Sequence, residues 1–185
     1  KLGSDVQYAS MARRIAAFAA DLLILAGFGA AIQILLAAMT GISLARTDLT
    51  GFQLEGLALL TISLPTWVYF IGFEMSALRA TPGKMLFRLV VADDDGHPLR
   101  RSRVVLRTFV KLFPLEATYM TFFIPQPFVS AAGRGEFRFG FFIVLGMGFV
   151  YLLVTTWNEQ HQSIHDLIAE SVVIEKGKPQ KWLKT

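Results

Sequence analysis

Cysteine is absent from this chain of 185 residues, and charged residues are scarce. Without cysteine there is no disulfide framework, no cysteine-ligated zinc or iron–sulfur centre and no thiol nucleophile. Charged residues make up 17% of the sequence, whereas a soluble domain usually carries about 25%. Hydrophobic residues make up 54%, which excludes a disordered chain and argues against an ordinary soluble enzyme.

Four long hydrophobic runs, largely free of lysine and arginine, are predicted to cross a membrane, at about 15–39, 56–76, 108–124 and 137–157. A hydrocarbon core of about 30 Å needs about 20 helical residues. The first run is too long for a signal peptide, whose apolar core has about 7–15 residues. The third run contains Lys111, Pro114 and Glu116, so it is either a short kinked span or a re-entrant segment.

The basic residues predict the orientation of these spans. Fifteen of the 18 lysines and arginines lie in the N-terminal segment, in residues 77–111 and in the C-terminal tail. Under the positive-inside rule this places both termini in the cytoplasm. Arg46, Arg134 and Arg138 would lie on the other side. The predicted fold class is an all-α membrane protein, a four-transmembrane-helix bundle forming one domain over residues 8–174, with a solvated tail at 175–185.

A small cytoplasmic element is expected between the second and third spans. Leu86–Ala92 has the composition of a strand, and Asp95-Gly96 is a hairpin turn signal. A second strand-like run is Ser171–Glu175. The sequence therefore predicts a small sheet on the inner face of the membrane, with a hairpin and an amphipathic helix between the second and third spans.

The amphipathic helix is predicted from four basic residues spaced at i, i+3, i+7 and i+11: Arg100, Arg103, Arg107 and Lys111. On a helix these positions form one stripe. A basic stripe that runs into a membrane span is suited to the anionic lipid headgroups of the inner leaflet. No nucleic-acid-binding module is recognisable, so lipid rather than nucleic acid is the expected partner.

Ionisable groups within a bilayer need a partner or a function, and here they gather in the cytoplasmic leaflet. They are Arg14, Asp21, Glu74, Glu116, His165 and Asp166. Arg14 and Asp21 are two helical turns apart on one face. Either Asp21 binds a cation or exchanges a proton, with Arg14 tuning its pKa, or ion pairs such as Arg14–Asp21 and Lys111–Glu116 lock the helices together. The outer half offers only Gln33 and hydroxyl groups, so no path through it is apparent.

No catalytic or cofactor site is predicted. His161 and His165 lie four residues apart and could share a metal with Glu159 or Asp166, but helix capping or headgroup contacts are the commoner role of such histidines. Thr81-Pro82-Gly83-Lys84 lacks the upstream glycine of a phosphate-binding loop. We therefore expect no metal, no other cofactor and no enzymatic activity.

Three sequence blocks together resemble the RDD family of small bacterial membrane proteins, named for one arginine and two aspartates. The first runs from Arg13 to Asp21 and matches the arginine and first aspartate at Arg14 and Asp21. The middle block holds Glu74, Thr81-Pro82-Gly83-Lys84, Val90-Val91, Asp95-Gly96 and Arg107. The last, His165-Asp166-Leu167-Ile168-Ala169 followed by Ser171-Val172-Val173, places the second aspartate at Asp166.

Two positions depart from the family pattern, because Arg88 and Glu170 stand where glycine is usual. The resemblance implies the four-span topology, and some members are associated with cation/proton antiport while others resemble accessory domains of membrane complexes. We expect a transport-related protein that exchanges or senses a proton or monovalent cation, as a homo-oligomer. The alternative is a non-catalytic assembly or scaffold subunit that binds lipid and a membrane partner. In that alternative Arg14, Asp21 and Asp166 form a latch between the spans and the tail.

Overall fold

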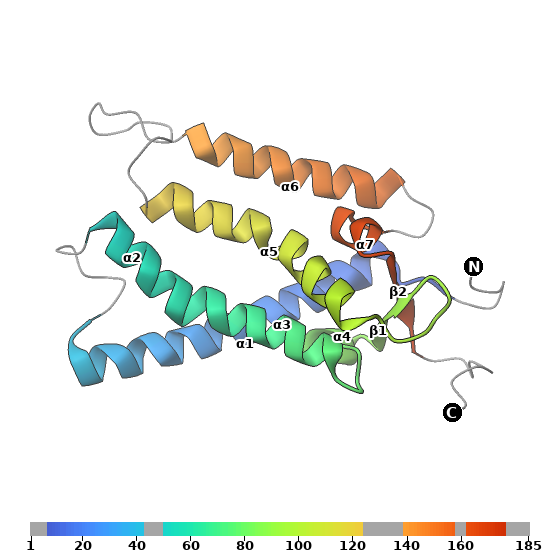
Figure 1. The fold of residues 1–185 in the computed structure, drawn as a ribbon, viewed down its shortest axis with the longest axis horizontal. Helices are drawn as coiled ribbons and strands as arrows, with labels where there is room; N and C mark the ends of the chain where they lie inside the picture. Colours follow the sequence, from blue (N-terminus) through green and yellow to red (C-terminus); the bar gives the residue numbers. More distant parts are fainter. Residues whose placement is uncertain (1–6, 43–49, 124–138, 158–161, 177–185) are drawn as a thin grey trace.

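A computed structural model describes residues 7–42, 50–123, 139–157 and 162–176. Long helices lie side by side along the long axis, and short elements cover one end (Figure 1). Three of the long helices are α1 (Met11–Thr40), α5 (Arg101–Phe123) and α6 (Phe139–Trp157). Between α1 and α5 in the sequence, α2 (Gly51–Ala58), the π-helix η1 (Leu59–Ser63) and α3 (Leu64–Met75) follow one another without a break and form one rod, here called the second rod. They cover the described parts of the four predicted spans.

Two of the described helices, Met11–Thr40 and Phe52–Met75, are long and apolar enough to cross a membrane. Helix α1 is apolar on every side, and its large side chains stay open to the surroundings: Leu23, Ile34 and Met39 are between 71% and 76% exposed. A helix that is hydrophobic all round belongs in a protein core or in lipid. Because α1 is not buried in the protein, lipid is its natural surrounding.

The second rod passes through one π-helical turn just before Pro65. Proline has no N–H with which to continue the α-helical ladder. Here the N–H of Leu64 bonds the carbonyl of Leu59, five residues back, and α3 then restarts with Pro65 in its first turn. π-Helical turns inside α-helices are frequent at functional sites, and this one lies against α5.

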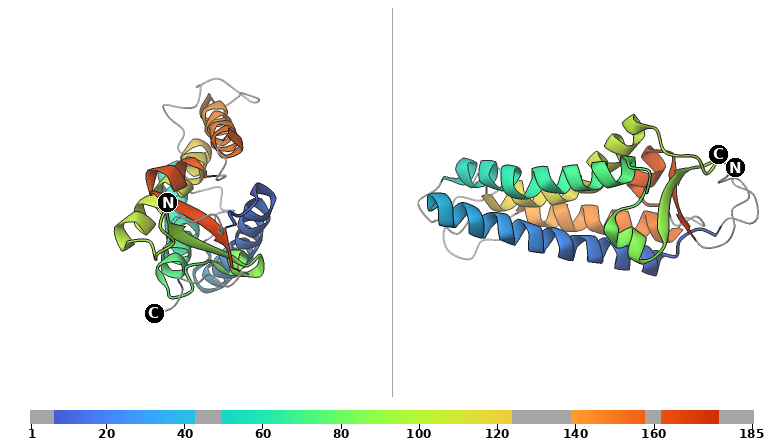
Figure 2. Two further views of the ribbon diagram at one scale, coloured as in Figure 1. Left: turned by 90° about the vertical axis from the view of Figure 1, so that its right-hand side faces the viewer. Right: turned by 90° about the horizontal axis from the view of Figure 1, so that it is seen from below.

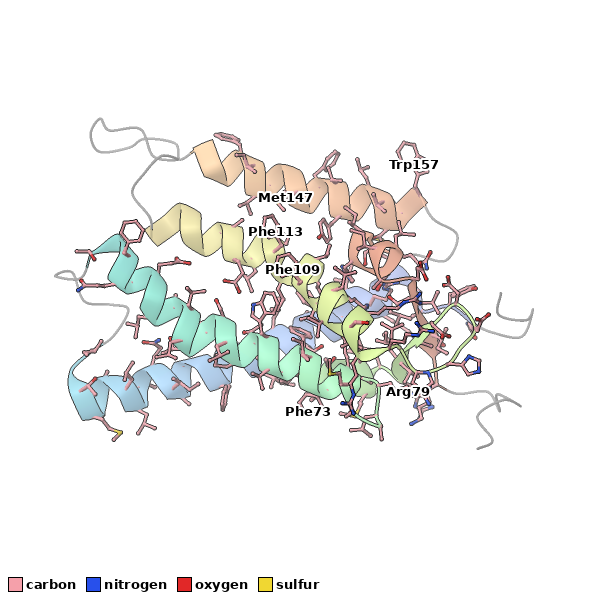
Figure 3. The ribbon with its side chains drawn as sticks, viewed as in Figure 1. Phe73, Arg79, Phe109, Phe113, Met147 and Trp157 are labelled. Carbon is pink, nitrogen blue, oxygen red and sulfur yellow. The ribbon has the colours of Figure 1, made fainter. Side chains whose placement is uncertain are left out.

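Helix α5 begins seven residues before the predicted third span and continues through Pro114. The basic residues from Arg103 to Lys111 are therefore helical, as the stripe predicted. Helix α6 packs on α5 and ends at Trp157, which is 87% exposed and points away from the bundle (Figure 3). Such an indole is typical of a membrane–water interface.

The short elements form a cap at one end: α4 (Pro82–Leu86), β1 (Leu89–Asp93), α7 (Ile164–Ile168) and β2 (Ser171–Glu175). Strands β1 and β2 pair antiparallel, with Leu89 opposite Glu175 and Asp93 opposite Ser171. Tyr8 adds a bridge to Ile174. The described chain thus starts and ends in this cap, which Figure 2 shows end-on and from below.

The predicted small sheet is present, built from the two strand-like runs. The predicted hairpin is wrong, although its turn is present. The chain turns after Asp93, whose carbonyl accepts the N–H of Gly96 (3.0 Å), and Gly96 has the positive φ of 85° that such a turn requires. The residues after the turn form no strand. β1 pairs instead with the chain end because Val172 and Val173 supply the apolar partners that its buried side chains need.

Candidate functional site

Arg107, on α5, is the centre of an ion-pair cluster beneath the cap. Its side chain is 1% exposed. Nη1 donates to Glu74 Oε2 (2.6 Å), at the end of α3, while Nε and Nη2 donate to Asp166 Oδ1 on α7 (2.9 and 2.6 Å). One guanidinium therefore joins three helices that are distant in sequence. Figure 3 shows nitrogen- and oxygen-bearing side chains gathered at this end.

Glu74 is shared by three cations. Besides Arg107, it accepts Lys84 Nζ at 2.6 Å and Lys111 Nζ at 3.3 Å, both on Oε1. Lys111 also lies over the ring of Phe70, with its Nζ 3.4 Å from the ring centroid. Burial lowers the pKa of Lys84, and the positive charge of Arg107 lowers it further. The carboxylate of Glu74 acts in the opposite direction but does not restore the usual value.

Asp166, the second carboxylate of the cluster, is fully buried. Its Oδ2 accepts Arg14 of α1 and the Ser163 hydroxyl (2.9 Å), and Ser163 with Asp166 forms the capping box that starts α7. Burial alone would raise the pKa of Asp166, but the charges of Arg107 and Arg14 hold it well below its usual value. Asp166 is therefore a permanent anion at neutral pH.

His165 lies beside this carboxylate, with Nε2 2.9 Å from the Ser163 hydroxyl and 3.5 Å from Asp166 Oδ1. Burial lowers the pKa of His165 well below the usual value, and the positive charges of Arg107, Lys111 and Arg14 lower it further. The negative charge of Asp166 raises the pKa, but not enough to offset these effects. The ring is neutral at neutral pH. His161, which the sequence pairs with it, lies outside the described residues.

Asp21 occupies a separate position, deeper along α1. Its carboxylate accepts the hydroxyls of Tyr69 (2.6 Å) and Thr81 (2.5 Å) and the backbone N–H of Gly83 (2.7 Å). Gly83 must be glycine, because a Cβ there would lie 2.2 Å from the carbonyl oxygen of Ala17. These contacts tie α4 and α3 to α1.

In the part of the chain that it describes, the structure forms neither of the two ion pairs that the sequence suggested, Arg14–Asp21 and Lys111–Glu116. Arg14 bonds Asp166 rather than Asp21, and Lys111 bonds Glu74 rather than Glu116. Charges on different helices meet more easily than charges two turns apart on one helix, since such residues lie about 10 Å apart along the axis. The ion pairs therefore run between helices, and Arg14 meets Asp166, a residue that the latch of the scaffold alternative also contains.

Glu116 lies deeper in the bundle than predicted. Its carboxylate accepts the hydroxyl of Ser63 (2.8 Å) and the indole N–H of Trp67 (2.9 Å), beside the π-helical turn. Farther along, Glu55 is 5% exposed, and neither of its carboxylate oxygens has a hydrogen-bond partner among the described residues. The bundle therefore carries buried carboxylates away from the cap, in addition to the Gln33 and hydroxyl groups that the sequence analysis assigned to the outer half.

The predicted lipid-binding stripe divides in two. Arg107 and Lys111 turn into the cluster and are 1% and 7% exposed, so the prediction that they contact headgroups is wrong. Both side chains point inward because they bind buried carboxylates, Glu74 on α3 and Asp166 on α7. Arg103 pairs with Glu170, and Arg100 remains exposed.

A cavity of about 640 Å³ opens beside the cluster. Its walls are apolar and come from α1 and α6, with Ile15 and Phe18 on one side and Leu145 and Phe149 on the other. Its polar lining is mostly basic: Arg14, Lys84, Arg107 and Lys111, with Asp21, Ser163 and His165. Among the described residues, no group of three or more histidine and acidic side chains could hold a metal ion.

Of the predicted polar site, the structure gathers Arg14, Glu74, His165 and Asp166 around Arg107 and Lys111, two residues that the sequence assigned to the lipid stripe. It places Asp21 and Glu116 apart from this cluster. Sequence reasoning missed the acceptor role of Glu116 beside Ser63 and Trp67, and it missed Glu55 altogether. Lys84 and Gly83 were visible in the Thr81–Lys84 block, but only as part of a resemblance.

Backbone geometry explains the two departures from the glycine pattern. Arg88 and Glu170 both have positive φ, at 56° and 47°, a region that favours glycine. The carbonyl of Arg88 accepts the N–H of Lys176 (2.6 Å), so this turn is tied to the end of β2.

Comparison with known proteins gives one match. The model of the RDD family matches residues 8–170 of the chain. No curated protein and no solved structure gives a significant match.

Proposed function

The chain belongs to the RDD family and is a mostly helical membrane protein, and from this premise we propose that it moves or senses a proton or a small monovalent cation. The single observation that carries the proposal is a series of carboxylates at different depths along the contact of the second rod with α5. They are Glu74 in the cap cluster, Glu116 beside the π-helical turn, and Glu55 near the start of the rod.

The spacing of these carboxylates fits a bilayer. Glu55 lies 19 positions before Glu74, which is about 28 Å at about 1.5 Å per residue and close to the roughly 30 Å of a hydrocarbon core. Glu116 lies between them, bonded to Ser63 and Trp67. Buried ionisable residues at successive depths are typical of proton and cation pathways.

In this proposal Asp21 is structural. Three donors already hold its carboxylate, and none of them is charged. Lys111 is placed to respond to protonation of Glu74, since its ammonium is 3.3 Å from that carboxylate.

The proposed topology has four spans, with the cap and both termini on the cytoplasmic side of a bacterial inner membrane. The basic residues gathered in the cap support it. The chain has no cysteine, so a single introduced cysteine is the only thiol that a maleimide can label. His97→Cys in the cap and Ile42→Cys beyond the other end of α1 should label from opposite sides with a membrane-impermeant maleimide. Labelling of both from one side would contradict the topology.

Transport is tested by cation-driven proton flux in proteoliposomes, with Na⁺, K⁺ and Li⁺ gradients on both sides of neutral pH. We expect flux in the parent protein, and none in Glu116→Gln, whose amide keeps the shape of the carboxylate. Glu170→Gln is the matched control, because that carboxylate is exposed and lies in the cap. Flux that survives Glu116→Gln, or is absent from the parent protein, would overturn the proposal.

The ion-pair cluster favours a second candidate, an assembly or scaffold subunit, in which it serves only as a latch between α1, α3, α5 and α7. A latch predicts that variants of Arg107 lose stability and that no gradient drives flux. The number of subunits in a homo-oligomer, which either function would allow, is measured by light scattering with the detergent subtracted.

A further inference from the structure

Glu55 differs from the other buried carboxylates that the structure describes, because nothing donates a hydrogen bond to it. The residue is 5% exposed, and among the described residues neither of its carboxylate oxygens has a partner. Three other acids are at least as deeply buried, and each accepts three or more hydrogen bonds: Asp21, Glu74 and Asp166. Glu55 alone of these four lacks the donors that stabilise a negative charge.

The surroundings of Glu55 on its own helix are apolar. Residues three and four positions apart are neighbours on a helix surface. For Glu55 these neighbours are Gly51, Phe52, Ala58 and Leu59. The polar groups at the start of α2 are engaged with each other, since the Thr50 hydroxyl accepts the N–H of Gln53 and Gln53 Oε1 accepts the N–H of Thr50.

These surroundings favour the neutral form of the Glu55 carboxyl group. An ionised carboxylate that is buried without a partner is so costly that the group takes up a proton instead. The protonated group has no net charge and leaves one O–H donor unpaired, which costs much less than an unpaired charge. Glu116 lies farther along the same contact of the second rod with α5, and two carboxylates on one apolar contact repel each other.

An alkali cation fits the surroundings of Glu55 poorly. Such an ion has to exchange its hydration shell for several oxygen ligands. Glu55 supplies two oxygens, and its apolar neighbours on the helix surface supply no side-chain oxygen. Among the described residues, no group of three or more histidine and acidic side chains could hold a metal ion. A proton needs only one oxygen, so it is the ion that Glu55 can bind.

Glu55 also lies near the end of the molecule opposite the cap, where Figure 1 shows α2. It follows the exposed N-cap residue Thr50 by five positions, which is roughly 7–8 Å along the helix at about 1.5 Å per residue. A proton therefore has a short way between the exposed start of α2 and the carboxyl group.

We infer that Glu55 is a proton site, closed to alkali cations, at the end of the proposed path farthest from the cap. Its place in that path rests on the proposed function. Release of the proton breaks the O–H bond of the carboxyl group and gives hydronium and a carboxylate. Reloading transfers a proton from hydronium to the carboxylate and leaves water. The neutral acid is the resting form.

The protonated state is tested by infrared spectroscopy of the full chain in liposomes at neutral pH, because a carboxylic acid has a C=O stretching band that a carboxylate lacks. We expect such a band in the parent protein, its loss in Glu55→Gln, and its retention in the control Glu170→Gln, which changes an exposed carboxylate. Addition of Na⁺, K⁺ or Li⁺ should leave the band unchanged. Glu55→Gln has the shape of the neutral acid, so it should melt at the temperature of the parent protein.

Three results would overturn the proton site. They are the absence of a band that depends on Glu55, the loss of that band when a cation is added, and a melting temperature of Glu55→Gln well below that of the parent protein.

Proton flux in the same liposomes tests the path separately. We expect Glu55→Gln to abolish flux, and flux that survives this change would overturn the place of Glu55 in the path. A Glu55 band in a parent protein without flux would confirm the proton site and overturn the proposed function. Flux in a parent protein without the band would support the proposed function and overturn the inference.

Discussion

Gly83→Ala is predicted to be among the most damaging single-methyl additions in the described chain. An ideal Cβ at Gly83 lies 2.2 Å from the carbonyl oxygen of Ala17 and 2.7 Å from Asp21 Cγ, whereas real Cβ contacts essentially never fall below 3.0 Å. α4 must therefore move by at least about 0.8 Å from α1. That movement lengthens the 2.7 Å bond from the Gly83 N–H to Asp21 beyond the roughly 3.2 Å limit of a good hydrogen bond.

Two costs add in this variant. Overpacking of a tight contact costs about 1–3 kcal/mol, and loss of a hydrogen bond to a charged group costs about 1.5–3 kcal/mol. Because Asp21 is 1% exposed, water cannot replace the lost donor easily. We expect a loss of about 3–5 kcal/mol in the free energy of unfolding.

The assay is thermal unfolding in a mild detergent, followed by tryptophan fluorescence. For a chain of this size 1 kcal/mol corresponds to about 2–4 °C, so the melting temperature should fall by about 6 °C or more. Gly72→Ala in α3 is the control, because its Cβ would meet nothing within 4 Å and alanine stabilises a helix interior by about 0.5–1 kcal/mol. Equal stability of the two variants would refute the assignment of the Gly83–Asp21 contact.

Three further predictions concern the cap. Arg88→Gly should raise stability by about 1 kcal/mol, because it relieves a left-handed backbone, whereas Arg88→Ala should give no gain; denaturant unfolding of both variants measures this. Arg107→Gln should cost about 3–5 kcal/mol, since it leaves two buried carboxylates short of their shared cation; the melting temperature measures this, and a loss within the range of an exposed control such as Arg100→Gln would contradict it. Stability should also fall as the pH drops below about 6.5, because the unfolded chain then protonates His165 while the fold, in which burial depresses the pKa of that ring, resists it. The slope reaches about 1.4 kcal/mol per pH unit; it should disappear in His165→Gln and persist in His97→Gln, whose side chain is 74% exposed.

The helices were predictable because their signal is local. Runs of apolar residues fixed the helices at 11–40, 51–75 and 139–157 to within a few residues, and Ser171–Glu175 was recognised as a strand from its own composition. The two strand-like runs suggested a small sheet, but the turn signal left the immediate partner of β1 open. The Asp95-Gly96 turn signal is local, but the choice of Val172 and Val173 as partners depends on apolar side chains about 80 positions away.

The same limit applies to the site. The spacing of the basic residues predicted that Arg107 lies on one face of a helix with Arg103 and Lys111. Spacing does not predict which residues of other helices pack against that face. Glu74 and Asp166 cover it here. Likewise, Glu116 was placed near the cytoplasm because it follows the start of the predicted span, and it lies deeper because α5 begins at Arg101.

The order of the elements along the chain has a consequence for biosynthesis, because α7 and β2 follow α6. Arg107 and Glu74 leave the ribosome well before Asp166, and the β1 edge stays open until Ser171–Glu175 follows. During synthesis Arg107 therefore has only one of its two carboxylate partners, and the cap cannot close before the last helix is in place. The segment with α7 and β2 therefore joins the cap only after α6 has been made. A nascent chain that stops short of this segment presents Arg107 with one of its two carboxylate partners missing and an open strand edge at β1.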